Sequence, residues 1–303
     1  MRRQDFLKAT GAGLVGLAAA PLGTGSLLRA FSTATEPDAV WVEQGEPVEL
    51  LTAAMAAYGG MQRFIAPGDV VLVKPNIGFD RTPAQAATTN PDLVAEVIRL
   101  VLEAGAKEVK VIDRTANNAR RSYARSEIEA SAKAVGGKVQ HVRDNRFKSI
   151  DLPQGKVLKS WPIYRDYLEA DKVINLPIAK QHTMSQVTGG LKNLMGVMGG
   201  NRGKIHRRFS KKIIDITAAI LPTVTIMDAY RILIANGPSG GNLADVRKPR
   251  TLIMSTCTVT ADCLATGLFD LQPTDLGYLR EALKRDINLF DQDNLNLKKI
   301  SLS

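Results

Sequence analysis

The chain has 303 residues, of which 45% are hydrophobic and 5% aromatic, and its formal net charge is +10. This length and apolar content suffice for one large domain or two modest ones, and plentiful glycine with few aromatic residues favours an α/β fold over an all-β sandwich. The basic charge suits anionic small molecules, lipid headgroups or cell-wall polymers. Aromatic and basic residues are not interleaved, so nucleic acid is not an expected partner.

The first 34 residues are predicted to be a targeting segment and not part of the fold. Arg2 and Arg3, followed by Phe-Leu, Lys8 and an apolar stretch rich in glycine and alanine, closely resemble a twin-arginine export signal. Small residues offer a cleavage site after Ala34. We therefore expect the twin-arginine translocation machinery to be a partner and the protein to be periplasmic, or membrane-anchored if the segment is not cleaved.

Residues 35–303 are expected to form a single α/β domain. The export segment carries +3 of the formal charge, from four basic residues and one acidic residue, which leaves about +7 on this domain. Its two cysteines, Cys257 and Cys263, are expected to be reduced and buried, because a strand end and the following helix rarely bring two cysteines into disulfide geometry. Two cysteines alone cannot hold an iron–sulfur cluster.

Apolar periodicity predicts alternating strands and helices along this domain. A continuous apolar run such as Val70–Val73 is typical of a buried parallel strand, and Asn90-Pro91 begins a helix that ends before Gly105. Strands are expected at 38–43, 70–73, 108–112, 138–142, 172–176, 224–227 and 251–255, and helices at 47–58, 92–104, 126–135, 209–220, 261–269 and 276–285.

This alternation predicts a mostly parallel sheet with helices on both faces, a doubly wound α/β fold. Residues 143–170 are less regular and are consistent with a small antiparallel insertion, an edge hairpin around Val157–Trp161. In open sheets of this type, ligands bind beyond the carboxyl ends of the parallel strands. If one of the strands were antiparallel, the residues that follow it would lie at the opposite edge of the sheet and not at this rim. The polar residues that follow predicted strands are Lys74, Asn76, Asp113, Lys180, His182, Asp228 and, slightly further on, Asp262.

The segment from Lys180 to His206 contains two of the three histidines, six glycines and several lysines. Dense glycine lets the backbone approach a ligand and turn its N–H groups toward an anion. A short helix from Leu191, preceded by a glycine pair, would favour phosphate or carboxylate at its N-terminus. The alternative is a flexible, solvated basic loop. A phosphate-loop motif fails because Met198 replaces its first glycine and Ile205 follows its lysine.

Several motifs together resemble domain of unknown function family 362, over nearly all of residues 70–285. The family's biochemical role is largely unassigned, so the resemblance implies a fold more than a reaction. Some relatives are fused to ferredoxin-type domains with iron–sulfur clusters, but this chain has no such cysteine-rich part. The family pattern usually has an acidic residue near the position of Cys257. The matching motifs are Val71–Asn76, Thr88–Pro91, Ile174–His182, Thr188–Gly196, Lys204–His206, Asp228, Asn236–Gly240 and Thr260–Asp262.

The first functional hypothesis is an enzyme that acts on a small anionic substrate. His182, His206 and Lys192 are the candidate catalytic groups, because histidine exchanges protons near neutral pH and lysine can bind or react with an anion. Asp113, Asp228 and Asp262 could orient the histidines or hold a divalent metal. The candidate ligand-binding residues are Lys74, Asn76, Lys180, Thr188, Asn193 and Lys204.

Three alternatives stay open. The residue types loosely resemble those of nickel-dependent lactate racemase, where lysine and histidines hold a metal-bearing organic cofactor. The protein could instead be a non-catalytic binding or accessory protein for a separate redox or cofactor-assembly partner, since no Gly-x-Ser-x-Gly or His-Glu-x-x-His motif is present. The histidines and aspartates could also be structural. Residues 236–241 could form a lid or a long turn.

Overall fold

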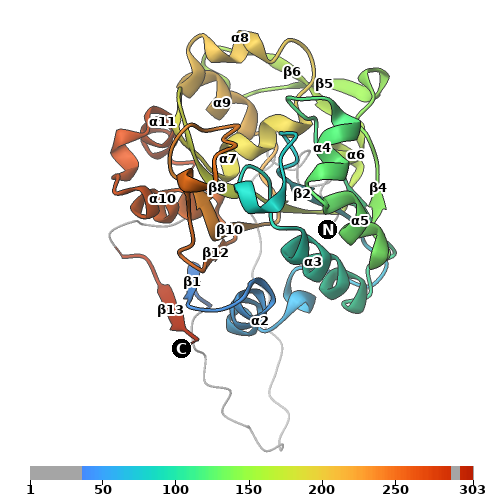
Figure 1. The fold of residues 1–303 in the computed structure, drawn as a ribbon. Coiled ribbons are helices and arrows are strands. Elements are labelled where there is room, and N and C mark those ends of the chain that lie inside the picture. Colours follow the sequence, from blue (N-terminus) through green and yellow to red (C-terminus); the bar gives the residue numbers. More distant parts are fainter. Residues whose placement is uncertain (1–35, 288–293, 303) are drawn as a thin grey trace, which may run out of the picture.

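The computed structural model describes residues 36–287 and 294–302, which form a mixed sheet with helices on both sides (Figure 1). The predicted export signal and its cleavage position lie outside these residues. Within the described ranges, no helix is long and apolar enough to cross a membrane.

The main sheet has the strand order β13-β1-β12-β10-β7-β2-β3-β4. Every neighbouring pair in this order is parallel except the two pairs that involve β12. The α/β prediction is therefore confirmed, with one reversed strand. The strands are β1 (Ala39–Glu43), β2 (Val70–Pro75), β3 (Glu108–Val111), β4 (Lys138–Val139), β7 (Lys172–Leu176), β10 (Val224–Leu233), β12 (Thr251–Ser255) and β13 (Leu297–Ser301).

Helices cover the two faces of this sheet because successive strand residues point to opposite sides. In β2, Val71 and Val73 pack with the helices on one face of the sheet, whereas Leu72 packs with those on the other face. The helices on the first face are α2 (Pro47–Ala57), α3 (Pro91–Glu103), α4 (Ala119–Arg125) and α5 (Ile128–Ala134). Those on the second face are α6 (Arg165–Glu169), α7 (Gly190–Asn193), α8 (Gly203–His206), α9 (Phe209–Thr217), α10 (Thr258–Thr266) and α11 (Gly277–Lys284).

The predicted hairpin exists, but at different residues and away from the main sheet. Strands β5 (Phe147–Asp151) and β6 (Ser160–Tyr164) form a separate antiparallel pair. Of the range around which the hairpin was expected, residues 157–159 lie in the connection, where the backbone N–H groups of Val157 and Leu158 donate to the Asp215 carboxylate, and residues 160–161 begin β6.

Two features of the sheet change the predicted rim. β12 is antiparallel to β10, so the residues after it begin at the opposite edge. β10 continues to Leu233, so Asp228 lies inside the strand and not beyond its end. A short extension, β8 (Ile178–His182), β9 (Gln186–Thr188) and β11 (Val246–Arg247), was not expected; β8 pairs with β10 and carries Lys180 and His182.

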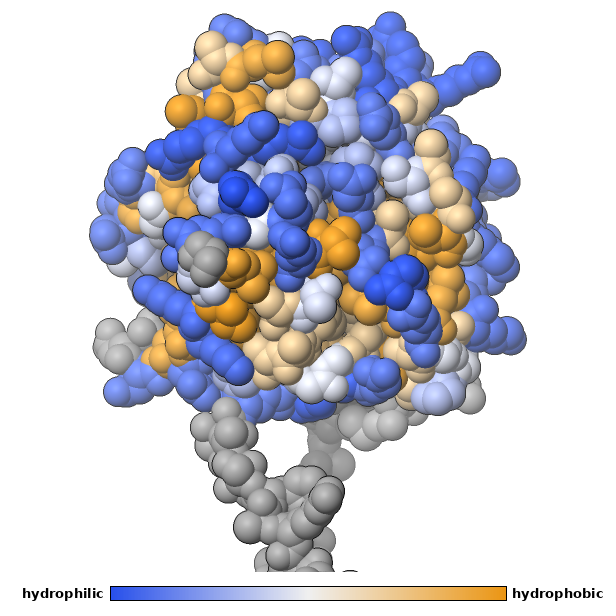
Figure 2. All heavy atoms as spheres, turned by 60° about the horizontal axis from the view of Figure 1, so that its bottom comes forward, coloured by the Kyte–Doolittle hydropathy of each residue, from blue (hydrophilic) through white to orange (hydrophobic). Residues whose placement is uncertain are grey.

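Cys257 and Cys263 are buried and form no disulfide with each other, in agreement with the prediction. Hydrophilic and apolar side chains alternate over the face seen in Figure 2. The large apolar residues with substantial exposure come from separate parts of the chain, which is normal for a folded surface. They are Val48, Met184, Ile234, Leu243 and Leu302.

Candidate functional site

A pocket of about 410 Å³ lies beyond the carboxyl ends of β2 and β3. It is closed on one side by β8 and on another by α7, the 3-10 helix η4 (Leu194–Val197) and α8. The polar residues that follow these strands therefore lie together at one edge of the sheet, as their parallel arrangement predicts. The lining includes eight predicted site residues, namely Asn76, Asp113, Lys180, His182, Thr188, Lys192, Asn193 and His206.

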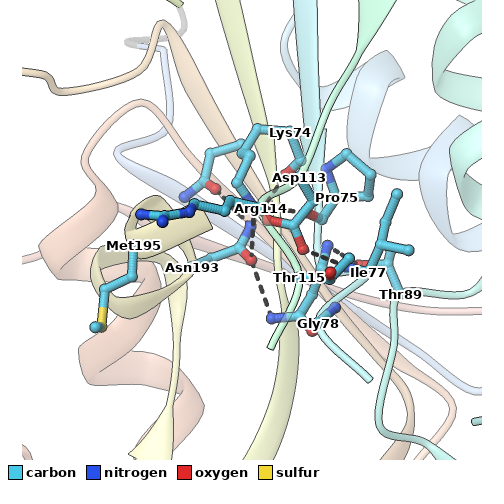
Figure 3. A network of polar contacts seen from close by, with 12 residues as sticks. Lys74, Pro75, Ile77, Gly78, Thr89, Asp113, Arg114, Thr115, Asn193 and Met195 are labelled. Atoms are coloured by element: carbon cyan, nitrogen blue, oxygen red, sulfur yellow. Dashed lines mark hydrogen bonds and ion pairs between the residues drawn. The ribbon is translucent and has the colours of Figure 1, made fainter. Parts of the chain in front are cut away.

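The floor of the pocket is a buried polar network (Figure 3). Lys74, at the end of β2, is fully buried and its Nζ lies 2.8 Å from Oδ1 of Asp113. The other carboxylate oxygen of Asp113 accepts the backbone N–H of Ile77 at 2.6 Å. Lys74 Nζ also donates to Asn193 Oδ1 at 3.2 Å. Both charges of this ion pair are thus compensated inside the protein, which is the condition under which buried ions are tolerated.

Gly196 makes this arrangement possible. A Cβ atom at that position would lie 1.7 Å from Asp113 Oδ1 and 2.7 Å from Lys74 Nζ. Glycine is required because η4 passes directly over the ion pair.

The network continues from the floor to Lys180. Asn76 Nδ2 donates to Asn193 Oδ1 at 3.1 Å, and Asn76 Oδ1 accepts from Lys180 Nζ at 3.1 Å. Lys180 also donates to the carbonyl oxygen of Ala87 and lies 4.4 Å from the centre of the Phe79 ring. Its pKa is well below the ordinary lysine value, because of burial and then the nearby Lys192 charge. This lysine is held in place by neutral acceptors.

Lys192 differs from the other two lysines. The residue is 8% exposed. Its Nζ lies 5.8 Å from the centre of the Phe209 ring and has no hydrogen bond or ion pair with any of the described residues. Burial lowers the pKa of Lys192 to about 7. An amine in this state is partly neutral at physiological pH and can accept or give a proton.

The two histidines lie at the same pocket but in different states. His182 Nδ1 accepts the backbone N–H of Met184 at 3.0 Å, so in the neutral ring the proton belongs on Nε2. Burial, then the Lys192 and Lys180 charges, lower the pKa of His182 to about 3. His206 is exposed, and its pKa is lowered by partial burial and then by Lys192 and Arg202. His182 is therefore a neutral donor near pH 7, whereas sequence reasoning had expected it to titrate there.

The N-terminus of α7 is already occupied by the protein's own carboxylate. Both oxygens of Asp262 accept backbone N–H groups, one from Gly190 and the other from Leu191 at 3.0 Å. A Cβ at Gly189 would lie 2.4 Å from Asp262 Oδ1, so this glycine is needed for the close approach. The predicted anion-binding role of this helix start is thus fulfilled by Asp262, and an external anion must bind elsewhere in the pocket.

The three aspartates proposed as metal ligands are not brought together. Asp228 is buried beneath the start of α3, where it accepts the backbone N–H of Asn90 at 2.7 Å, and Asp262 anchors α7. Asp113 alone lines the pocket, paired with Lys74. Across residues 36–287 and 294–302, no three His, Cys, Asp or Glu side chains are placed to share a metal ion. These aspartates act through hydrogen bonds to the backbone and one ion pair, which does not fit a metal centre.

Other predicted residues lie close to the pocket without lining it, or away from it. Lys74 lies beneath the floor, and Lys204 is exposed outside the pocket.

Thr188 lines the pocket, and its buried Oγ1 has no hydrogen-bond partner within the described part of the chain. A buried hydroxyl without a partner is costly, and a ligand atom would relieve that cost.

Arginines line the pocket as well. Arg114 follows Asp113 at the end of β3, and Arg202 precedes α8. The Arg202 guanidinium donates to the carbonyl oxygens of Arg114 at 2.8 Å and Thr115 at 2.9 Å, which fixes it against the wall. Arg114 was not predicted as a site residue; its place directly after the strand-terminal Asp113 was the available signal.

The profile of a family described as "Domain of unknown function (DUF362)" matches residues 71–267, about two thirds of the chain and all strands that build the pocket. The chain belongs to this family. The matched range begins within β2 and ends after α10, so it contains Lys74, Asp113, Lys180 and Lys192. Membership of the family shows this kinship without assigning a reaction.

A protein sequence and a solved structure are similar to this chain. A thylakoid-associated protein of Synechocystis sp. is 29% identical over 242 residues, which are 77% of this chain and 73% of that protein. The solved structure of the lactate racemase apoprotein from Thermoanaerobacterium thermosaccharolyticum is similar with a TM-score of 0.42 and 12% identity. That match covers 69% of this chain, which spans only 55% of the racemase chain. At this level of similarity it supports no argument about chemistry.

Proposed function

We propose that the pocket binds a small anionic molecule, a carboxylate or a phosphate, and that the protein is an enzyme acting on it. The observation that carries the proposal is the unpaired Lys192 amine in a pocket whose one lining carboxylate, that of Asp113, is already paired with Lys74. Arg202 and Lys180 add donors that hydrogen-bond neutral oxygens, and Arg114 adds a guanidinium whose carboxylate partner, Asp144 at 3.7 Å, is exposed. Such a site attracts an anion because its positive charge exceeds its negative charge.

Lys192 is the group assigned to chemistry. An amine with a pKa of about 7 is present in both protonation states at neutral pH, so it serves as acid or base in the same cycle. His182 serves as a neutral hydrogen-bond donor through Nε2, and Thr188 supplies a hydroxyl without a partner in the described structure. His206, at the edge of the pocket, is the second candidate for proton transfer.

The binding step can be tested by thermal unfolding of the full chain with phosphate, acetate or pyruvate, at constant ionic strength set with chloride. A ligand present at about 100 times its dissociation constant stabilises the folded state by about 2.7 kcal/mol. We expect the melting temperature to rise with at least one anion, to saturate, and to lose this response in Lys192→Met. Lys204→Met, a change outside the pocket, should keep the response.

An accessory protein without catalysis would give the same binding result but no turnover of the bound anion and a requirement for a second protein. This alternative, a redox or cofactor-assembly partner, is therefore distinguished by incubating the purified protein alone with the stabilising anion and following the anion by NMR. Chemical change of the anion supports the enzyme, and an unchanged anion supports the accessory role.

We further propose export by the twin-arginine route, which rests on the first 34 residues. Arg2→Lys together with Arg3→Lys should abolish recovery of the protein from the periplasm, since that route reads the arginine pair. Unchanged periplasmic recovery of this double variant would contradict the proposal.

A further inference from the structure

Three buried or nearly buried lysines surround the pocket, and the structure separates them by what their amines contact. Lys74 is ion-paired with Asp113, and Lys180 donates to Asn76 Oδ1 and the Ala87 carbonyl. Lys192 Nζ has no such partner within the described residues, although 92% of its surface is covered. An amine without acceptors keeps its lone pair available when it is neutral.

The surroundings of Lys192 favour that neutral form. The charge of Lys192 lowers the pKa values of Lys180, His182 and His206, so these three groups lie close to it. Burial lowers the pKa of Lys192, and desolvation in a pocket is one of the ways in which a lysine becomes a nucleophile. At pH 7, an amine with a pKa of about 7 is about half neutral, whereas ordinary lysine is neutral in well under 1% of molecules.

We propose that Lys192 forms an imine with a small carbonyl compound that carries a carboxylate or a phosphate. This inference rests on the proposed function, because the anionic group is what the cationic wall would bind. The carbonyl carbon is then placed against the one amine of the site that is not engaged with the protein.

The step needs no oxidant or metal. The Lys192 lone pair attacks the carbonyl carbon, the C–O π bond opens, and a proton moves from nitrogen to oxygen to give a carbinolamine. The hydroxyl then leaves as water, with one proton taken from the site or solvent, and the second N–H proton is released as the C=N bond forms. His182, whose ring proton lies on Nε2, can donate to the carbonyl oxygen and so stabilise the charge that develops there.

The position of Lys192 is fixed from two sides. Asp262 accepts the N–H groups of the two residues that precede the lysine in α7, and Asn193, the residue after it, joins the network of Lys74 and Asn76. A nucleophile on a short, anchored helix keeps its geometry without a bond to its own amine. These anchors explain how a buried, unpaired lysine can be held at the pocket wall.

The test is borohydride trapping on the full-length protein. Brief incubation with pyruvate, then sodium borohydride, converts an imine into a stable carboxyethyl-lysine that peptide mapping by mass spectrometry locates. We expect label at Lys192 to exceed label at the exposed Lys204 by roughly tenfold or more at pH 7.5, from the larger neutral fraction. Glycolaldehyde phosphate in a parallel arm distinguishes a phosphate from a carboxylate ligand, and acetone, which has no anionic group, should label weakly.

Lys192→Arg separates this inference from the proposed function. Arginine keeps the positive charge but forms no imine, so this variant should retain the anion-dependent rise in melting temperature and lose the label. Label concentrated on Lys180, or spread equally over surface lysines, would overturn the inference. If an anion stabilises the protein but no label is found, the imine proposal is wrong and the proposal of an anion-binding pocket is unaffected. If the wild-type protein shows neither stabilisation by an anion nor label, the imine proposal and the proposed function are both wrong.

Discussion

Two regions of this protein are rich in cations, and they differ in what the cations contact. The hollow of about 780 Å³ beside the β3–β4 edge contains Lys110, Lys138 and Arg146. There, Lys110 and Arg146 contact Asp166 at 2.9 and 3.2 Å, and Lys138 contacts a glutamate of β3. In the pocket at the carboxyl ends of β2 and β3, the buried Lys192 has no ion pair with any carboxylate of residues 36–287 or 294–302.

The difference shows that the number of cations alone does not identify a binding site. Partly exposed cations that are paired with carboxylates change the stability of the fold little, because water screens their charges. A buried amine without a counter-charge lowers the stability of the fold, and our proposal of a ligand and a reaction rests on this cost. The predictions below, in order of decreasing expected effect, test whether the two regions differ in this way.

The largest effect is expected at the floor of the pocket. In Gly196→Ala, the added Cβ would displace Asp113 from Lys74 and leave two buried charges uncompensated. Breaking such a pair costs about 3–5 kcal/mol. Urea unfolding should show a loss of this size. Gly267→Ala is the matched control, because a Cβ there meets nothing within 4 Å; an equal loss in both variants would contradict the proposed role of the glycine.

Lys192→Met should stabilise the protein in a pH-dependent manner. The pKa of Lys192 is lowered from 10.5 to about 7 in the folded protein, so between these values the unfolded chain binds the proton and the folded chain does not. Stability of the wild type therefore rises with pH across this range, and the full cost is present below pH 7. The variant should gain about 4–5 kcal/mol at pH 6, from a lowering of about 3.5 pKa units at about 1.4 kcal/mol each, and nearly nothing above pH 10.5.

The measurement is urea unfolding of wild type and Lys192→Met at several pH values. A stability difference that does not change between pH 6 and pH 10.5 would mean that the lysine keeps its ordinary pKa. In that case the contrast between the two cation-rich regions would disappear.

In the second region, Asp166→Asn removes the carboxylate that Lys110 and Arg146 share. Because both cations are partly exposed, we expect a loss of about 1 kcal/mol. We also expect no new stabilisation by phosphate, since solvated cations bind anions weakly. Phosphate-dependent stabilisation of the Asp166→Asn protein beyond that of wild type would show that cation number is sufficient after all.

The smallest effect is expected at Lys204. This residue belongs to the glycine-rich segment and was predicted to bind the ligand, but it is exposed outside the pocket. Lys204→Gln should change stability by less than about 0.5 kcal/mol, as is usual for such surface changes. A loss of anion-dependent stabilisation in this variant would place the ligand nearer to α8 than the structure indicates.

The regular parts of the fold could be predicted because their residues follow a simple period. The apolar run of β2 and the Asn90-Pro91 start of α3 determine local structure through burial and capping, and both lie within one residue or two of their predicted positions. The direction of β12 is set by its pairing with β1 and β10, which no local pattern in 251–255 reveals.

The sequence predicted that several polar residues would share one pocket, but not the electrostatics of that pocket. The rim argument brought Asn76, Asp113, Lys180 and His182 to one pocket, as the structure shows. It could not tell that Asp262 would occupy the start of α7, because that contact joins segments 72 residues apart. Which lysine is paired and which is not depends on such long-range contacts, so the distinction of Lys192 could not be predicted from the sequence.

The central claim, that Lys192 is a buried amine available for chemistry, is tested most directly by its own titration. Competitive acetylation with a trace amount of isotope-labelled reagent, followed by peptide mapping at each pH, measures the neutral fraction of this one lysine in the intact protein. The account predicts a midpoint near pH 7 for Lys192. A midpoint near 10.4, the value of an unperturbed lysine, would contradict it.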